Sequence, residues 1–90
     1  MREIRVTVVN PLGLHARAAA QLVRLAGSFQ SRIVLRRVGS EISADARSIL
    51  SLLTLSASIG SYLDIKVEGE DAEAALAAVS ELFETGFGEI

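Results

Sequence analysis

The spacing of the apolar residues alternates between two periods along this chain, and this alternation restricts the possible folds more than any other feature. Apolar side chains at every second position predict strands over residues 3–9 and 60–69. The apolar run Ile33-Val34-Leu35 predicts a strand over residues 32–38, and a short strand is expected over 41–44 after the turn that follows it. Apolar side chains at helical spacing predict helices over residues 16–27, 47–55 and 71–85. The predicted order is therefore strand, helix, strand, strand, helix, strand, helix.

This order predicts an α+β protein in which the helices cover one face of a single antiparallel sheet. Gly39-Ser40 supplies a turn between the second and third strands, so these two should form a hairpin. A chain of 90 residues is long enough for one hydrophobic core, and we expect one domain over residues 1–90.

Asp71 is expected to cap the last helix. The helix over 47–55 has apolar residues around its circumference, so part of its apolar surface should stay exposed.

Composition excludes several classes of function. The chain has no Cys and one His, which argues against a disulfide scaffold, a thiolate zinc site, a cysteine nucleophile and a histidine-ligated metal. It also lacks a carboxylate loop of the EF-hand kind, so we expect neither a metal nor a cofactor. No apolar run approaches the roughly 20 residues that cross a bilayer, and the charged start lacks a signal-peptide core. We expect a cytoplasmic protein without membrane insertion.

The charges are unevenly distributed along the sequence. Residues 1–48 carry eight Arg and three acidic residues, whereas residues 49–90 carry one Lys and eight acidic residues. A basic half suits either nucleic acid or an acidic protein as a partner. Because only 4% of the residues are aromatic, few side chains can stack on bases. The predicted partner is an acidic protein, and no nucleic acid is expected.

His15 is the only side chain whose ordinary pKa lies near neutral pH, and it stands where a glycine-containing loop enters a predicted helix. The unpaired N–H groups of Ala16 and Arg17 and the helix dipole favour an uncharged imidazole, which can attack an electrophile. The same N–H groups and the Arg17 guanidinium can hold a phosphoryl group. A plain helix cap by His15 with a solvated Arg17 is the simpler alternative. A hydrolase triad would need residues that are distant in sequence, namely Ser28, Ser31, Asp45 and Ser48.

The segment Gly13-Leu14-His15-Ala16-Arg17-Ala18-Ala19 closely resembles the active-site segment of HPr, the family of histidine-containing phosphocarriers of the bacterial phosphotransferase system. The resemblance covers the whole chain in the family's order, through Asn10, Phe29, Gly39, residues 46–50, Thr54-Leu55, Gly60, Gly69, Ala75-Leu76 and Phe87-Gly88-Glu89. It implies an open-faced β-sandwich with a four-stranded antiparallel sheet under three helices. It also implies a phosphocarrier and not an enzyme, in which His15 accepts phosphate from phosphoenolpyruvate-charged enzyme I and passes it to enzyme IIA.

The resemblance also implies how such a carrier would meet its partners. Arg17, Arg24, Ile49 and Leu50 would suit the acidic, apolar docking faces of enzyme I and enzyme IIA, and we expect a monomer. Ser48 precedes this apolar pair, and its hydroxyl can cap the helix that follows. Ser48 also matches the serine that a regulatory kinase phosphorylates in many Gram-positive members of the family. The two roles of Ser48 are compatible, and both stay open.

The sequence departs from the family's pattern at three places. Ala18 stands where most members have Pro directly after the Arg, so the first turn of the helix loses a residue with a preset φ. Ser56 stands where Gly is usual, which puts a backbone bend in doubt. The interval from Gly39 to Ser48 is two residues longer than in typical members, which should lengthen the exit of the hairpin and alter the docking edge.

Two further alternatives concern the function itself. Asn10-Pro11-Leu12-Gly13 and the run over residues 82–87 also resemble the nitrogen-regulatory branch of the family, which relays phosphate to regulators instead of sugars. The sequence leaves the choice between the branches open. Small α+β sheets also serve as ligand-binding regulatory modules or acylphosphatase-like enzymes, so a function from another class stays open as well.

Overall fold

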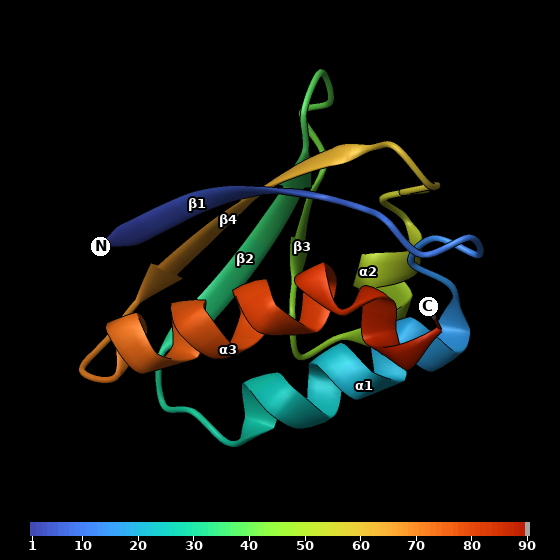
Figure 1. Ribbon diagram of the computed structural model, residues 1–90. Helices are drawn as coiled ribbons and strands as arrows, with labels where there is room; N and C mark the ends of the chain where they lie inside the picture. Colours follow the sequence, from blue (N-terminus) through green and yellow to red (C-terminus); the bar gives the residue numbers. More distant parts are fainter. Residues whose placement is uncertain (90) are drawn as a thin grey trace.

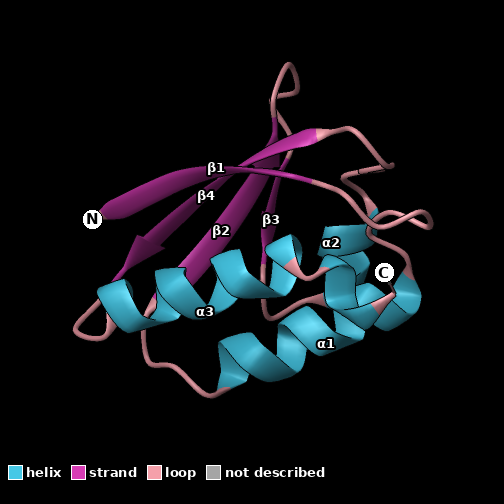
Figure 2. Cartoon of the chain, in the orientation of Figure 1, coloured by secondary structure: helices cyan, strands magenta, loops and turns pink. Residues whose placement is uncertain are grey.

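The computed structural model describes residues 1–89, in which three helices lie on one side of a four-stranded antiparallel sheet (Figure 1). The helix layer and the strand layer are separate in Figure 2. This is the predicted open-faced arrangement, and the strand order across the sheet is β1-β4-β2-β3. The elements in chain order are β1 (Arg2–Thr7), α1 (Ala16–Gly27), β2 (Arg32–Arg37), β3 (Ser43–Asp45), α2 (Ile49–Leu53), β4 (Tyr62–Glu68), α3 (Ala72–Glu84) and the short helix η1 (Gly86–Gly88).

The core lies between the sheet and the helices. Every second residue of each strand points toward the helices. Ile4, Ile65 and Leu35 are therefore neighbours across β1, β4 and β2. Each helix contributes one apolar stripe to the same layer, represented by Leu22 from α1 and Val79 from α3, which are both fully buried. The alternation seen in the sequence therefore marks the two faces of the sheet.

The opposite face of the sheet is open to solvent and carries charged residues. Asp64 in β4 is only 6% exposed, yet it is paired on both sides. Arg5 of β1 donates to it at 2.9 Å, and Arg36 of β2 donates at 3.2 Å. The hydrogen bond from Arg5 is the main cause that lowers the pKa of Asp64 below its ordinary value. This row of ion pairs joins the three longer strands on the open face.

The predicted boundaries are confirmed for α1 and differ elsewhere. The first strand ends at Thr7, although the Val8 N–H still donates to Ser61 O at 2.8 Å. The third strand starts at Ser43 because the preceding residues form a turn, with Gly39 at a φ of 91° and Ser40 Oγ accepting from the Ile42 N–H. The connection between β2 and β3 projects beyond the sheet in Figure 1.

Helix α2 is shorter than predicted, with five residues in place of the expected span 47–55. It starts after Ser48, whose hydroxyl caps it, so Arg47 lies outside. It ends before Ser56, which adopts a φ of 50° and forms the bend that the missing glycine put in doubt. The chain therefore keeps the bend with a residue for which this conformation is unfavourable.

Asp71 stands at the N-cap of α3, but the expected capping hydrogen bond is absent and that prediction was wrong. Its carboxylate instead accepts from the backbone N–H groups of Gln30 and Ser31 and from the Ser31 hydroxyl. Asp71 therefore ties the connection between α1 and β2 to the start of α3. The neighbours of Asp71 along the chain give no signal of this contact, because Ser31 lies 40 positions away in sequence.

Candidate functional site

His15 is held at the end of a loop that leaves no room for a side chain at Gly13. The φ of Gly13 is 66°, and a Cβ at this position would lie 2.5 Å from Ala57 O. The next residue, Leu14, donates its N–H to the same carbonyl at 2.8 Å. These contacts fix the backbone on the N-terminal side of His15 against the segment between α2 and β4.

The His15 ring occupies the N-cap position of α1. Its backbone is extended, with φ −79° and ψ 179°, and the ring atom Nδ1 accepts a hydrogen bond of 3.2 Å from the Arg17 N–H. The side chain is 26% exposed. The first N–H groups of a helix have no partner within the helix, so Nδ1 faces a cluster of backbone donors. The backbone donors that His15 caps are therefore the same groups that the sequence analysis expects to bind an anion.

On its other side, the ring contacts a residue to which the sequence analysis assigned no role. His15 Nε2 lies 2.5 Å from Oε2 of Glu89, which is 74 positions away in sequence. Asn10 Nδ2 donates to the same oxygen at 3.1 Å and to Gly13 O at 2.7 Å. The hydrogen bond from His15 is the main cause that lowers the pKa of Glu89, and the one from Asn10 adds to it.

The signal for Glu89 in the sequence is a pair of glycines around an aromatic residue. Gly86, Phe87 and Gly88 all have positive φ, at 61°, 56° and 78°, which turns the chain back after α3. Phe87 is buried and packs edge-on against Phe83, with ring centroids 5.0 Å apart. In Figure 1 this red segment lies beside the N-terminal end of α1. Periodicity alone contains no information on this turn.

The two basic candidates on α1 are exposed. Arg17 and Arg24 are seven positions apart, or about two helical turns, so they project from one side of the helix. Within residues 1–89, neither guanidinium makes a hydrogen bond or an ion pair. Both are accessible to an anionic group from outside the chain. Ala18 is the third residue of α1 and is fully buried, and the helix starts at Ala16 without a Pro.

The exposed apolar surface predicted on α2 is present. Leu50 is 78% exposed, and Ile49 and Leu53 are also exposed, whereas Leu52 is buried. Leu12, in the loop before His15, is 70% exposed and was not identified from the sequence. The hydroxyl of Ser48 accepts from the Ser51 N–H at 3.2 Å, which confirms the capping role of this serine.

The structure does not bring the candidate triad residues to His15. Ser28 donates to Leu25 O, Ser31 donates to Asp71, and Asp45 accepts from the Arg47 N–H. Among residues 1–89, no group of three or more His, Cys, Asp or Glu side chains could hold a metal ion. None of the helices in that range is long and apolar enough to span a membrane.

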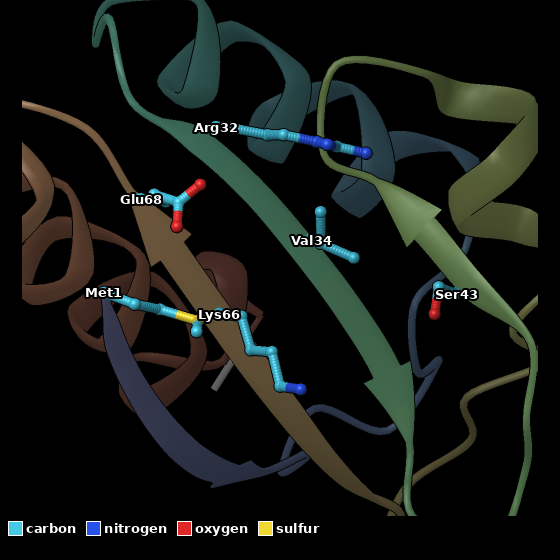
Figure 3. Close-up of a pocket in the computed structure, with 6 residues that line it drawn as sticks. All are labelled: Met1, Arg32, Val34, Ser43, Lys66 and Glu68. Carbon is cyan, nitrogen blue, oxygen red and sulfur yellow. The ribbon is translucent and has the colours of Figure 1, made fainter.

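A hollow on the open sheet face also lies away from His15. Figure 3 shows its six lining residues on β2, β3, β4 and the residue before β1, with the ribbons of the helices behind the sheet. In this view Val34, on β2, lies between the side chains of Arg32 and Lys66. None of the six residues contacts the imidazole. His15, at the N-cap of α1, lies outside this hollow.

Comparison with known proteins gives concordant results. The family PTS-HPr, described as "PTS HPr component phosphorylation site", matches residues 2–85. The phosphocarrier protein HPr of Xylella fastidiosa is 45% identical over 89 residues, covering 99% of this chain and 98% of that protein. The phosphocarrier protein NPr of Proteus mirabilis is 41% identical over 85 residues, covering 94% and 93%. The crystal structure of HPr-C-His from Thermoanaerobacter tengcongensis aligns with a TM-score of 0.92 at 36% identity, covering 100% of this chain and 99% of that chain.

The fold and these matches define a phosphocarrier of the phosphotransferase system, a class that carries a phosphoryl group and does not turn over a free substrate. The chain belongs to the HPr family. This assignment confirms the resemblance found in the sequence. It favours a carrier over a ligand-binding module or an acylphosphatase.

Proposed function

We propose that Nδ1 of His15 accepts a phosphoryl group from phosphoenolpyruvate-charged enzyme I and passes it to enzyme IIA. The observation that carries this proposal is the contact of 3.2 Å between Nδ1 and the Arg17 N–H at the start of α1. A backbone N–H can only donate, so Nδ1 presents its lone pair at this point. A lone pair on an exposed ring nitrogen is the nucleophile that phosphoryl transfer requires.

The surroundings of Nδ1 also suit the phosphorylated state. Once Nδ1 is bonded to phosphorus, the Arg17 N–H becomes free to donate to a phosphoryl oxygen, and the Ala16 N–H lies next to it in the first turn. The exposed Arg17 guanidinium can add a charge-assisted and bidentate contact. The neutral His15 ring that would accept the phosphoryl group therefore lies next to the groups that would bind it. The proposed transfer requires no metal or cofactor.

We further propose that the partner proteins dock on α1 and α2 around the ring. Arg17 and Arg24 supply positive charge on one helix, and Ile49 and Leu50 supply exposed apolar surface on the other. Helices α1 and α2 pack against each other, so the two parts can form one continuous surface. The carrier would act as a monomer in the cytoplasm, and Ser48 would be a site at which a serine kinase alters docking.

A second candidate is a carrier of the nitrogen-regulatory branch, which would relay phosphate to regulators. The observation in its favour is that relatives named NPr match at identities similar to those of relatives named HPr, for example 42% over 87 residues for the protein of Shewanella violacea. The segment over residues 10–13 supports the same branch. The two branches differ in their enzyme I and enzyme IIA proteins, not in the chemistry at His15.

The test is phosphorylation of the purified chain, followed by intact mass. Incubation with phosphoenolpyruvate and enzyme I should add one phosphate to the wild type and none to His15→Ala, and the label should be lost in acid. Equal labelling of the two proteins would refute the assignment. Parallel incubations with enzyme I of the sugar branch and of the nitrogen branch assign the branch, because the cognate enzyme should give the faster labelling.

A further inference from the structure

The two nitrogens of the His15 ring contact groups of opposite hydrogen-bonding character. Nδ1 faces the Arg17 N–H at 3.2 Å, and Nε2 faces the Glu89 carboxylate at 2.5 Å. The side chain of Glu89 is 20% exposed, so this contact is partly shielded from water. The ring is therefore held from both sides.

These contacts determine which nitrogen carries the hydrogen. An N–H donates and an ionised carboxylate accepts, whereas a neutral imidazole has one donor and one acceptor nitrogen. Only the tautomer with hydrogen on Nε2 satisfies both neighbours. In this tautomer the lone pair is on Nδ1, beside the backbone donors of α1.

The position of Glu89 is itself determined by the fold. The left-handed run from Gly86 to Gly88 directs the chain toward the ring, and buried Phe87 anchors it. Gln21 of α1 donates to Phe87 O at 3.3 Å, which ties the segment to the helix that carries His15. Asn10, which is fully buried, donates to the same carboxylate oxygen at 3.1 Å. The turn that contains Phe87 and the side chain of Asn10 thus place Oε2 of Glu89 at Nε2 of His15.

We propose that Glu89 is a positioning residue for phosphoryl transfer, which keeps the hydrogen on Nε2 and thereby directs the phosphoryl group to Nδ1. This inference rests on the proposed function of His15. A carboxylate on the far side of an imidazole orients the ring and stabilises the positive charge that develops on it during attack. Here the nucleophile is the imidazole itself.

The step balances with phosphoramidate, a small donor that needs no docking. The lone pair of Nδ1 forms the new P–N bond, the P–N bond of the donor breaks, and its electron pair leaves with ammonia. The hydrogen on Nε2 stays on His15, so the ring gains positive charge while Glu89 remains ionised beside it. With a protein donor, the electron pair returns to the donor's own phosphorylated group. Loss of Glu89 should slow this step on the order of tenfold, the value of one hydrogen bond to a charged group.

The experiment compares wild type, Glu89→Gln and Glu89→Ala, with Glu84→Gln as a control that removes the same charge five positions earlier. The readouts are the NMR resonance of the Nε2-bound hydrogen and the rate and position of labelling by phosphoramidate. We expect a protected Nε2–H resonance and Nδ1-phosphohistidine in wild type and Glu84→Gln. Glu89→Ala should lose the protection, react about tenfold more slowly at Nδ1 and form some Nε2 product. Glu89→Gln should keep the resonance, because its amide oxygen still accepts, and should react at an intermediate rate.

A Glu89→Ala protein with the wild-type rate, or with the wild-type resonance, would overturn the inference. A Glu89→Gln rate at or below that of Glu89→Ala would also overturn it, and this comparison remains available if Glu89→Ala fails to fold. The proposed function has a separate test, because it fails only if His15→Ala still takes up the label. The two failures are thus distinguishable.

Discussion

Asp71 Oδ1 accepts a hydrogen bond of 2.9 Å from the backbone N–H of Ser31, which lies 40 positions earlier in the chain. The second carboxylate oxygen accepts from the Gln30 N–H at 2.8 Å. The hydrogen bond from the Ser31 hydroxyl is the main cause that lowers the pKa of Asp71. A carboxyl group with a depressed pKa in the folded state stabilises the fold only while it is ionised.

This relationship predicts a specific dependence of stability on pH. The contribution of Asp71 is fully present above the ordinary pKa of an aspartate, which is about 3.9, and it is lost as the pH falls through the lower folded-state value. Asp71→Asn should therefore lower the free energy of unfolding at pH 7, and its stability should fall less than that of wild type when the pH is lowered from 5 to 2. Urea denaturation at several pH values measures both effects. Glu70→Gln, one position away, serves as the control and should follow the wild-type curve.

Ser56 provides a prediction of the opposite sign. Its φ of 50° is unfavourable for a residue with a Cβ, and its side chain is exposed, so a glycine loses nothing there. Ser56→Gly should raise the free energy of unfolding by about 1 kcal/mol, because the relief of strain exceeds the entropy that glycine adds to the unfolded chain. Ser58→Gly, in the same connection and without a positive φ, should leave stability unchanged or lower it. A lower melting temperature for Ser56→Gly would contradict the argument.

Features that depend on residues close together in the sequence were predictable, whereas contacts between residues far apart in the sequence were not. The extent of α1, the hairpin of β2 and β3 and the cap at Ser48 were predicted, because the residues that determine them are close together in the sequence. The partner of Asp71 and the contact between His15 and Glu89 were not predicted, since they join residues 40 and 74 positions apart. For Asp71 the local sequence offered a simpler use of the same side chain, the cap of α3, which the distant contact replaces. For His15 the local cap and the distant contact with Glu89 are both present, on different ring nitrogens.

Arg17 should contribute to transfer more than to folding. Its side chain is exposed and makes no hydrogen bond within residues 1–89, so the fold does not depend on it. Arg17→Lys keeps the charge and loses the planar pair of donors that fits a phosphoryl group, which should slow transfer from enzyme I on the order of tenfold. The melting temperature should stay near that of wild type. Arg24→Lys is the matched control, since it lies on the same side of α1 but away from the ring, and it should change the rate less.

Two substitutions at Ser48 should separate its capping role from its place on the docking surface. Asp is as good an N-cap as Ser, so Ser48→Asp should keep the stability of the wild type. Its charge lies directly before exposed Ile49 and Leu50 and should repel an acidic partner. Ser48→Ala removes the cap without adding charge, which should cost about 1 kcal/mol of stability and leave the transfer rate unchanged.

The measurement that separates these effects is the rate of His15 phosphorylation over a range of enzyme I concentrations, together with thermal unfolding. Ser48→Asp should be severalfold slower at low enzyme I, and the difference should shrink at high enzyme I or in added salt, because added salt screens charge repulsion. A phosphate on Ser48 should act in the same direction and more strongly, since it carries about two negative charges. An unchanged rate for Ser48→Asp at every enzyme I concentration would remove α2 from the docking surface. It would leave Arg17 and Arg24 on α1 as the remaining contact with the donor.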